Sequence, residues 1–146
     1  MKNNHLIRIA LLIFTCGIFA NTHAQNTQVH ITAIRSDKGK IILKIFKDQA
    51  TFEKEQAFKT QSFDKKTLKN GELNVSIDLS PGTYGITLLD DENNDGKLEK
   101  SFVGMPKEGF GFSNFFLQKM KKPTFDEFKT QIKKDENKVQ IKVKYM

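Results

Sequence analysis

The amino-acid sequence predicts an all-β fold, a single sandwich of about seven to eight antiparallel strands. Short segments in which apolar and polar residues alternate recur along the chain, and this two-residue period is typical of half-buried strands. Turns that contain glycine or proline separate these segments. After residue 24, no segment shows the longer apolar period of an amphipathic helix, which excludes a helical fold.

The first 24 residues are predicted to be a secretion signal. Lys2 and Arg8 make the start positive, residues 9–19 form a short apolar core, and residue 24 is the small alanine that signal peptidase favours. The apolar core is too short for a membrane anchor, since a spanning helix needs about 20 apolar residues. We therefore expect residues 25–146 to form one exported domain, located in the periplasm, at the outer membrane or outside the cell.

The single cysteine, Cys16, lies within this predicted signal. Attachment of a lipid would require cleavage directly before Cys16, but Thr15 occupies a position where Gly, Ala or Ser is usual. Cleavage after Ala24 would leave a domain without cysteine. Such a domain has no disulfide and depends on its core or on a bound ion for stability.

The formal net charge is +7, and lysine supplies nearly all of the cations. Two of the positive charges lie in the predicted signal, and Arg35 is the only arginine after it. Nucleic-acid readers use arginine forks for phosphate and guanine, so we expect no nucleic-acid partner. The charge is interpreted as a solvated surface, with weak attraction to anionic lipids or polymers as the alternative.

The first two strands are predicted over residues 29–33 and 40–46, joined as a hairpin by the turn residues 36–40. Residues 48–59 contain two phenylalanines among charged residues and fit one short helix or an irregular crossover. The strand over residues 73–79 alternates cleanly, so one of its faces belongs to the core and the other faces water.

Pro81 and Gly82 fit the second and third positions of a type II turn, where positive φ suits glycine. The chain then returns as a strand over residues 83–89, whose core-facing side chains are Tyr84, Ile86 and Leu88.

The C-terminal part contains less regular segments. Residues 98–105 fit a short strand, and residues 107–114 form a predicted loop rich in glycine and phenylalanine. Residues 124–127 fit a single capped helical turn, and residues 128–132 fit a strand start as well. Residues 139–145 alternate again and predict a last, deeply buried strand.

An acid-rich stretch, Asp91-x-Asn93-x-Asp95-Gly96-x-Leu98, matches the first half of a calcium loop of the EF-hand kind. In such a loop oxygen side chains turn onto the cation, Gly96 permits the sharp bend and Leu98 anchors the loop in the core. The twelfth position is Phe102 instead of a bidentate Glu, and the flanks fit strands, which excludes a helix-loop-helix sensor. The predicted calcium ligands are Asp91, Asn93, Asp95, the carbonyl of Lys97, and Glu99.

A tight Asn-Asp-Gly turn over residues 94–96, without any metal, is the alternative to this calcium loop. Calcium is the only cofactor that the sequence suggests.

The same acids do not fit a catalytic pair, and no catalytic residue is assigned. A paired-carboxylate hydrolase needs one acid with a raised pKa and a second that stays ionised across a cleft, whereas these acids crowd a predicted exposed loop. His30, the only histidine after residue 24, lies on a predicted strand, where a structural role is usual. We therefore expect no enzyme activity, with a small hydrolase that uses the acidic cluster and His30 as the alternative.

The segment from Pro81-Gly82-Thr83-Tyr84 through the acid-rich loop to the run PKEGFGFSN, residues 106–114, resembles DUF2141, an uncharacterised family of exported bacterial proteins. The resemblance extends over most of the chain after residue 24. It implies a small β-sandwich of the prealbumin-like or Ig-like kind, similar to carboxypeptidase-regulatory-like modules, without an assigned activity. Glu99 stands where Asp is common in the family, which keeps the carboxylate. The turn and the acid-rich loop are also similar to the calcium-bearing B-type repeats of bacterial surface proteins.

Three glycines, at positions 104, 109 and 111, are expected to let the backbone bend, so that this segment folds over the acidic loop and closes one end of the sandwich. A ligand-facing aromatic patch is the alternative. Sugar binding is disfavoured because the chain contains no tryptophan. We therefore expect a binding or structural module of the cell envelope with an unidentified partner or ligand, and a periplasmic carrier of a small apolar or anionic ligand is a further alternative.

Overall fold

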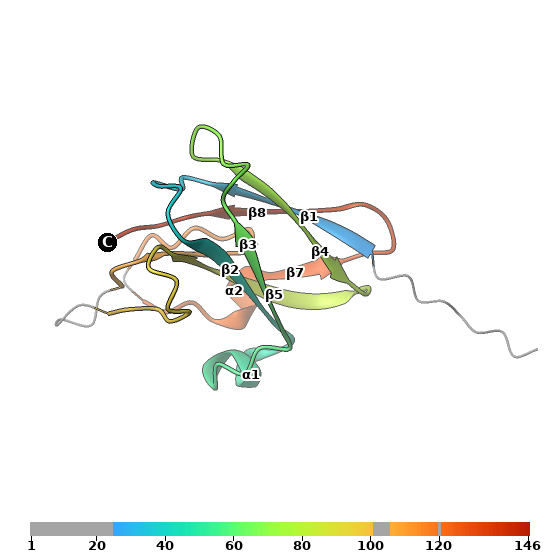
Figure 1. Ribbon diagram of the computed structural model, residues 1–146. Helices are drawn as coiled ribbons and strands as arrows, with labels where there is room; N and C mark the ends of the chain where they lie inside the picture. Colours follow the sequence, from blue (N-terminus) through green and yellow to red (C-terminus); the bar gives the residue numbers. More distant parts are fainter. Residues whose placement is uncertain (1–24, 101–105, 120) are drawn as a thin grey trace, which may run out of the picture.

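The computed structural model describes residues 25–100, 106–119 and 121–146, which form two β-sheets and two short helices (Figure 1). The strands are β1 (Gln25–Thr32), β2 (Lys40–Phe46), β3 (Lys59–Asp64), β4 (Leu73–Leu79), β5 (Gly82–Asp91), β6 (Gly109–Phe112), β7 (Lys129–Ile132) and β8 (Asn137–Lys142), and the helices are α1 (Gln49–Glu53) and α2 (Phe125–Phe128). The predicted all-β class is confirmed. The predicted secretion signal, with Cys16, lies outside the described residues.

The first sheet has three strands in the order β4-β1-β8, and the second has the order β3-β2-β5-β6. β1 and β8 run parallel, which is the one exception to the predicted antiparallel pairing among the named strands. The long strand β5 pairs with β2 along one edge. Its other edge is shared, since β7 pairs with Gly82–Gly85 and β6 pairs with Thr87–Asp90.

The predicted hairpin between residues 29–33 and 40–46 is wrong. β1 pairs with β4 and β8 in the first sheet, whereas β2 pairs with β3 and β5 in the second. The connecting residues therefore carry the chain from one sheet to the other. Both strands have a strongly apolar face, and a sandwich buries these faces against each other across the layers instead of side by side in one ladder.

Two strands were not predicted. β3 is a mostly polar edge strand whose only large apolar residue is Phe63, so its sequence gives no alternation signal. β6 lies within the segment that was predicted as a loop, residues 107–114, and it is only four residues long. The strand predicted over residues 98–105 is absent from its described part, residues 98–100, where only Lys100 forms a bridge, to Pro106; the remainder lies outside the described residues.

The predicted helical elements agree better with the structure. Helix α1 lies within residues 48–59, and Asp48 caps it by accepting a hydrogen bond from the N–H of Thr51 (2.8 Å). Helix α2 forms the predicted helical turn and β7 follows it directly, so both interpretations of residues 124–132 are right. The predicted last strand is β8, which begins before the predicted residue 139 and ends at Lys142 instead of residue 145.

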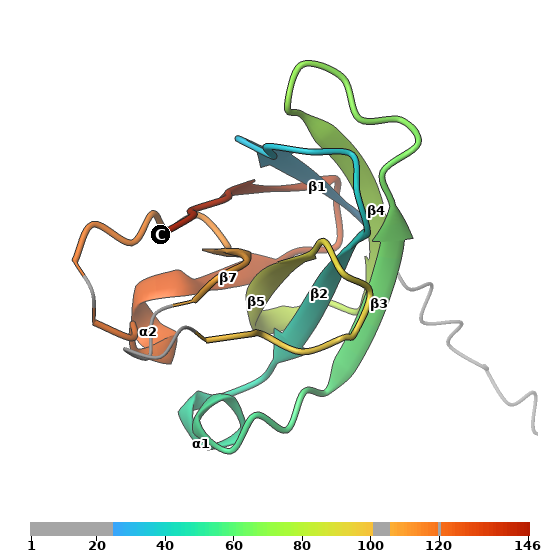
Figure 2. The same cartoon turned by 60° about the vertical axis from the view of Figure 1, so that its left-hand side comes forward.

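The main core lies between the two sheets. It contains the inward residues of β1, β2, β4, β5 and β8, including Ile31, Leu43, Ile77, Ile86 and Ile141. A second apolar cluster, here called the phenylalanine layer, consists of Phe46, Phe52, Phe125 and Phe128, with Phe112 and Phe115 packed against it. Because Phe46 alternates with the core residue Ile45 along β2, this layer covers the outer face of the second sheet. Helices α1 and α2, which contribute Phe52, Phe125 and Phe128 to it, lie on this side of the sheet (Figure 2).

The glycines of β6 have a different role from the expected one. Neither Gly109 nor Gly111 has a positive φ; a Cβ at Gly111 would lie 2.6 Å from the side chain of Ile141 and 3.1 Å from the carbonyl oxygen of Lys142. These glycines therefore allow β6 to approach β8 closely, and they do not serve to bend the chain. Gly104 lies outside the described residues.

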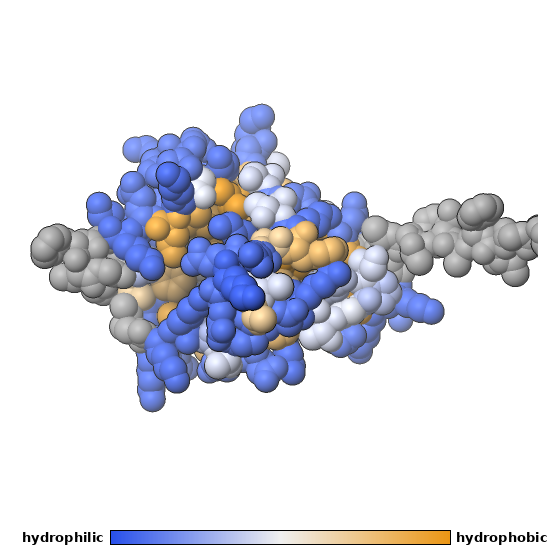
Figure 3. Space-filling view, turned by 90° about the horizontal axis from the view of Figure 1, so that it is seen from below, coloured by the Kyte–Doolittle hydropathy of each residue, from blue (hydrophilic) through white to orange (hydrophobic). Residues whose placement is uncertain are grey.

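Seen from below, the surface is mostly hydrophilic with apolar areas between the polar side chains (Figure 3). Within the described residues, no helix is both long and apolar enough to cross a membrane.

Candidate metal centre

Two acidic residues end the buried strand β5 and point to opposite faces of the second sheet. Asp90 and Asp91 are both fully buried. Asp90 faces the interior, where it contacts Lys65 and Tyr145. Asp91 faces outward, toward the following acid-rich loop and Lys40, whose Nζ lies 3.5 Å from Asp91 Oδ2.

The loop after β5 curls around the carboxylate of Asp91. Its Oδ1 accepts a hydrogen bond from the N–H of Asp95 (3.1 Å), and its Oδ2 accepts one from the N–H of Gly96 (3.0 Å). Gly96 has a φ of 74°, a left-handed conformation that glycine adopts without strain. The predicted sharp bend is therefore present at Gly96, and both carboxylate oxygens of Asp91 lie on the inner side of this bend.

Three carboxylates meet at this bend: Asp91, Asp95 and Glu108 each place one oxygen within 4.8 Å of the others. Asp91 and Glu108 are buried, and Asp95 is exposed. Glu108 was not among the predicted ligands, because it lies far along the chain from the loop. It arrives there because Gly109, the next residue, pairs with Asp90 in the β5–β6 ladder.

The surroundings of Glu108 do not satisfy its carboxylate. Oε1 accepts a hydrogen bond from the N–H of Glu92 (3.2 Å), whereas Oε2 is buried without a hydrogen-bond partner among the residues that the structure describes. Burial raises the pKa of Glu108, and the negative charges of Asp91 and Asp95 raise it further, whereas the backbone N–H groups of Glu99 and Glu92 act in the opposite direction. Lys40 is the only cation in contact with the three carboxylates among the described residues, so the cluster has an excess of negative charge when it is ionised.

The other predicted ligands lie around this cluster. Asn93 supports Asp95, since its Oδ1 accepts the N–H of Asp95 (3.0 Å) and its Nδ2 donates to Asp95 Oδ2 (3.1 Å). The N–H of Lys97 donates to Asp95 Oδ1 (2.7 Å). Glu99 is exposed and stands outside the carboxylate cluster, but its carbonyl accepts the N–H of Lys107 (2.9 Å).

The contacts of Lys107 and Glu108 show that the segment before β6 folds against the acidic loop, as expected from the sequence. Leu98, in contrast, does not anchor the loop in the core. Its side chain is 41% exposed.

His30 has its polar partners in the first sheet and away from the acid cluster. Its Nδ1 lies 2.8 Å from Oδ1 of Asn74, and its Nε2 lies 3.9 Å from a carboxylate oxygen of Glu72. These contacts hold the imidazole along the surface between β1 and β4. None of them involves an acid of residues 90–99.

A separate charged network closes the same end of the sandwich from the inside. The fully buried Lys65 forms an ion pair with Asp90 and donates to the carbonyls of Ser36 (3.0 Å) and Lys38 (2.6 Å). The hydroxyl of Tyr145 donates a hydrogen bond to Asp90. Burial of the hydroxyl, and to a smaller extent this hydrogen bond, raises the pKa of Tyr145 well above its ordinary value. Lys65 thus has an ionic partner and two carbonyl acceptors within the fold, so this network is interpreted as structural.

A comparison with protein-family models matches residues 29–140 to a family described as "Uncharacterized protein conserved in bacteria (DUF2141)". The matched region includes the acid-rich loop and Glu108. Comparisons with the curated proteins and with the solved structures give no match.

Proposed function

The chain belongs to the DUF2141 family, and from the site at the end of β5 we propose that it is an exported, non-catalytic module of the cell envelope, fastened by calcium. The signal-like pattern of residues 1–24 supports export. The module role covers binding to, or structural support of, an envelope partner that the site does not identify.

One observation carries the calcium proposal, namely that Oε2 of Glu108, beside Asp91 and Asp95, is buried and has no hydrogen-bond partner in the described part of the chain. An ionised carboxylate is costly to bury unless a cation or hydrogen bonds compensate it. A divalent cation at this position would neutralise the three carboxylates and use the free oxygen. Metal binding would therefore compensate buried negative charge in this cluster. An ordinary Asn-Asp-Gly turn has no such buried charge to compensate.

The donor set favours calcium over transition metals. The residues available are carboxylates, the amide oxygen of Asn93 and backbone carbonyls, and calcium prefers such oxygen ligands. Glu108 would provide the carboxylate that the loop lacks at its twelfth position, where the sequence has Phe102. Exported modules commonly bind calcium at about 10⁻⁴ to 10⁻³ M, which suits a site outside the cytosol.

The burial of the acids supports a non-catalytic role. Glu108 has a raised pKa beside a second acid, as in a paired-carboxylate hydrolase, but such an enzyme works on a substrate in an open cleft. Asp91 is fully buried, and both of its oxygens accept hydrogen bonds from the loop backbone. A sugar or ester would not reach the pair without unfolding the loop.

The test is a calcium titration monitored by thermal unfolding. In chelator-treated protein, about 10 mM calcium should stabilise the fold by about 1.5–3 kcal/mol for a dissociation constant of 10⁻³ to 10⁻⁴ M, which corresponds to a rise of roughly 5–10 °C in Tm. Asp95→Asn should abolish the rise in Tm, because it removes the negative charge of one of the three carboxylates. Asp95 is exposed, so this change does not alter the core. Asp78→Asn, at an exposed acid on β4, is the matched control and should keep it.

No rise in Tm at millimolar calcium would refute the metal site. The same variants address catalysis, since in a hydrolase Asp91→Asn would keep the fold and lose turnover of ester or glycoside substrates. In the proposed module, Asp91→Asn and Asp95→Asn change stability and its calcium dependence, and wild-type protein shows no turnover to lose.

A further inference from the structure

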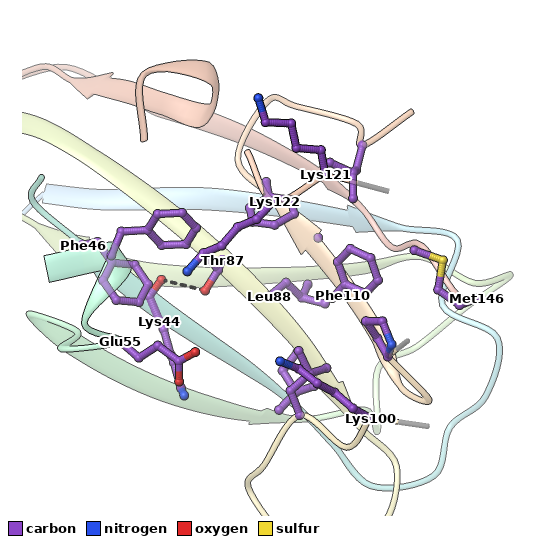
Figure 4. Close-up of a pocket in the computed structure, with 17 residues that line it drawn as sticks. Lys44, Phe46, Glu55, Thr87, Leu88, Lys100, Phe110, Lys121, Lys122 and Met146 are labelled. Atoms are coloured by element: carbon purple, nitrogen blue, oxygen red, sulfur yellow. Dashed lines mark hydrogen bonds between the residues drawn. The ribbon is translucent and has the colours of Figure 1, made fainter. Parts of the chain in front are cut away.

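A cavity of about 380 Å³ lies on the outer face of the second sheet, beside the phenylalanine layer (Figure 4). Two rows of paired residues cross this face, Ile42-Leu89-Phe110 and Lys44-Thr87-Phe112, because directly opposite residues of neighbouring strands point to the same side. Phe46, Leu89, Phe110 and Phe112 line the cavity, with further apolar side chains from Leu98 and Leu117. Its volume falls at the lower end of the range of small-molecule sites.

Apolar side chains remain exposed around this cavity. Leu98, which was predicted to lie in the core, is 41% exposed, and Met146 is 39% exposed. Both line the cavity. An apolar ligand would therefore gain contact with side chains that the protein itself leaves in water.

Positive charge surrounds the cavity. Four lysines line it, namely Lys44, Lys100, Lys121 and Lys122, and Glu55 is the one acid among its described lining residues. Lys100 and Lys122 extend along the cavity from opposite sides (Figure 4), and Lys122 Nζ lies 4.4 Å from the centre of the Phe52 ring. Because the walls are apolar, a negative charge held among these lysines is attracted more strongly than it would be in open water.

We propose that this cavity binds a small amphipathic anion, specifically an unbranched acyl chain of medium length that ends in a carboxylate. The chain lies against Leu89, Phe110 and Phe112, and the carboxylate faces the lysines. A neutral apolar molecule would use only the walls, and a hydrophilic anion would use only the lysines. A medium-chain carboxylate uses both features.

The site is distinct from the metal centre. None of Asp91, Asp95 and Glu108 lines the cavity, although Leu98 belongs to the acid-rich loop and Lys100 follows it closely in the chain. The two proposals can therefore fail separately, because calcium binding is measured by the Tm response and ligand binding by the competition described next. The competition is carried out both with chelator and with calcium.

The test is displacement of 1-anilinonaphthalene-8-sulfonate, an apolar anionic dye whose fluorescence rises in apolar sites. Decanoate should displace the dye at concentrations below its micelle formation. Decanol should compete less well, and decyltrimethylammonium should compete at least tenfold less well than decanoate, because the lysines repel its charged head.

Variants separate the two parts of the site. Lys44→Gln and Lys100→Gln should each weaken decanoate roughly fivefold, as expected for a partly exposed charge pair, and should leave decanol unchanged. Leu98→Ala should weaken decanoate and decanol alike. Lys134→Gln removes the same charge from an exposed position outside the cavity and is the matched control for folding and net charge.

Failure of decanoate to displace the dye, in chelator and in calcium, would overturn the proposal. Equal competition by decanoate and decanol, with no effect of the lysine variants, would also overturn it. A third contradictory outcome is binding to phosphatidylglycerol vesicles without any binding of monomeric decanoate, since this would indicate a membrane surface instead of a ligand site.

Discussion

The carboxylate of Glu108 lies beside that of Asp91, and both are buried although they come from separate segments of the chain. The pairing of β6 with the end of β5 forces this proximity, because Gly109 stands opposite Asp90. Two buried carboxylates with oxygens within 4.8 Å of each other repel each other when both are ionised. Stability should therefore depend on whether a proton or a metal compensates them.

Replacing Glu108 by glutamine should make the stability of the protein independent of calcium. The glutamine side chain keeps an oxygen for the N–H of Glu92 but removes the buried negative charge. We expect Glu108→Gln to raise Tm in chelator and to eliminate the rise on adding calcium. Thermal unfolding with and without calcium measures both effects, and a calcium response equal to that of the wild type would exclude Glu108 as a ligand.

The pH dependence of the calcium-free protein follows from the raised pKa of Glu108. A raised pKa means that the folded state holds the proton more tightly than the unfolded state does, so the free energy of unfolding decreases as pH rises. This decrease should start near the ordinary glutamate pKa of about 4.3 and end at the raised folded value. Glu92 has the opposite sign, since Arg35 lowers its pKa, and its contribution is lost only below that range.

Denaturant unfolding at a series of pH values should detect the decrease in wild-type protein and not in Glu108→Gln. Calcium should reverse it, because a bound cation favours the ionised carboxylate. A wild-type profile identical to that of the variant in chelator would contradict the predicted role of Glu108.

The buried ion pair between Lys65 and Asp90 predicts a large effect of removing one partner. Lys65→Met leaves the charge of Asp90 without its cation and should lower the free energy of unfolding by about 3–5 kcal/mol. The double variant Lys65→Met/Asp90→Asn should recover part of this loss. Urea unfolding gives the values, with Lys66→Met as the control, since Lys66 is highly exposed and should change stability by less than about 0.5 kcal/mol.

The close approach of β6 to β8 predicts an overpacking effect at Gly111. The added methyl group of Gly111→Ala would press against Ile141 and should cost about 1–3 kcal/mol. Ile141→Ala in the same chain removes Cγ2, the atom that the added methyl group would meet, and should make the cost of Gly111→Ala smaller than it is in the wild-type background. A double-mutant cycle by urea unfolding measures this coupling, and additive effects would show that the two strands do not press on each other there.

Strands with a regular alternation of apolar and polar residues could be located from the sequence. Residues 73–79 coincide with β4, and the core side of β5 carries the predicted Tyr84, Ile86 and Leu88. This criterion did not identify β3 or β6. β3 is almost entirely polar, and β6 alternates phenylalanine with interior glycines. The hairpin was misplaced for another reason, since alternation identifies a buried face but not the sheet to which the strand belongs.

The candidate metal centre, too, could be predicted only in part from the sequence. The local pattern of Asp91, Asn93, Asp95 and Gly96 was sufficient to predict a loop with oxygen atoms turned inward, because hydrogen bonds between near neighbours in the chain form that bend. Glu108, the unsatisfied carboxylate beside this loop, could be identified only from the pairing of β5 with β6. The lysine-rimmed cavity likewise joins residues from strands that are distant in sequence. Periodicity and turn chemistry act over a few residues and are written in the sequence directly, whereas the neighbours of a buried charge depend on how the sheets pair and pack.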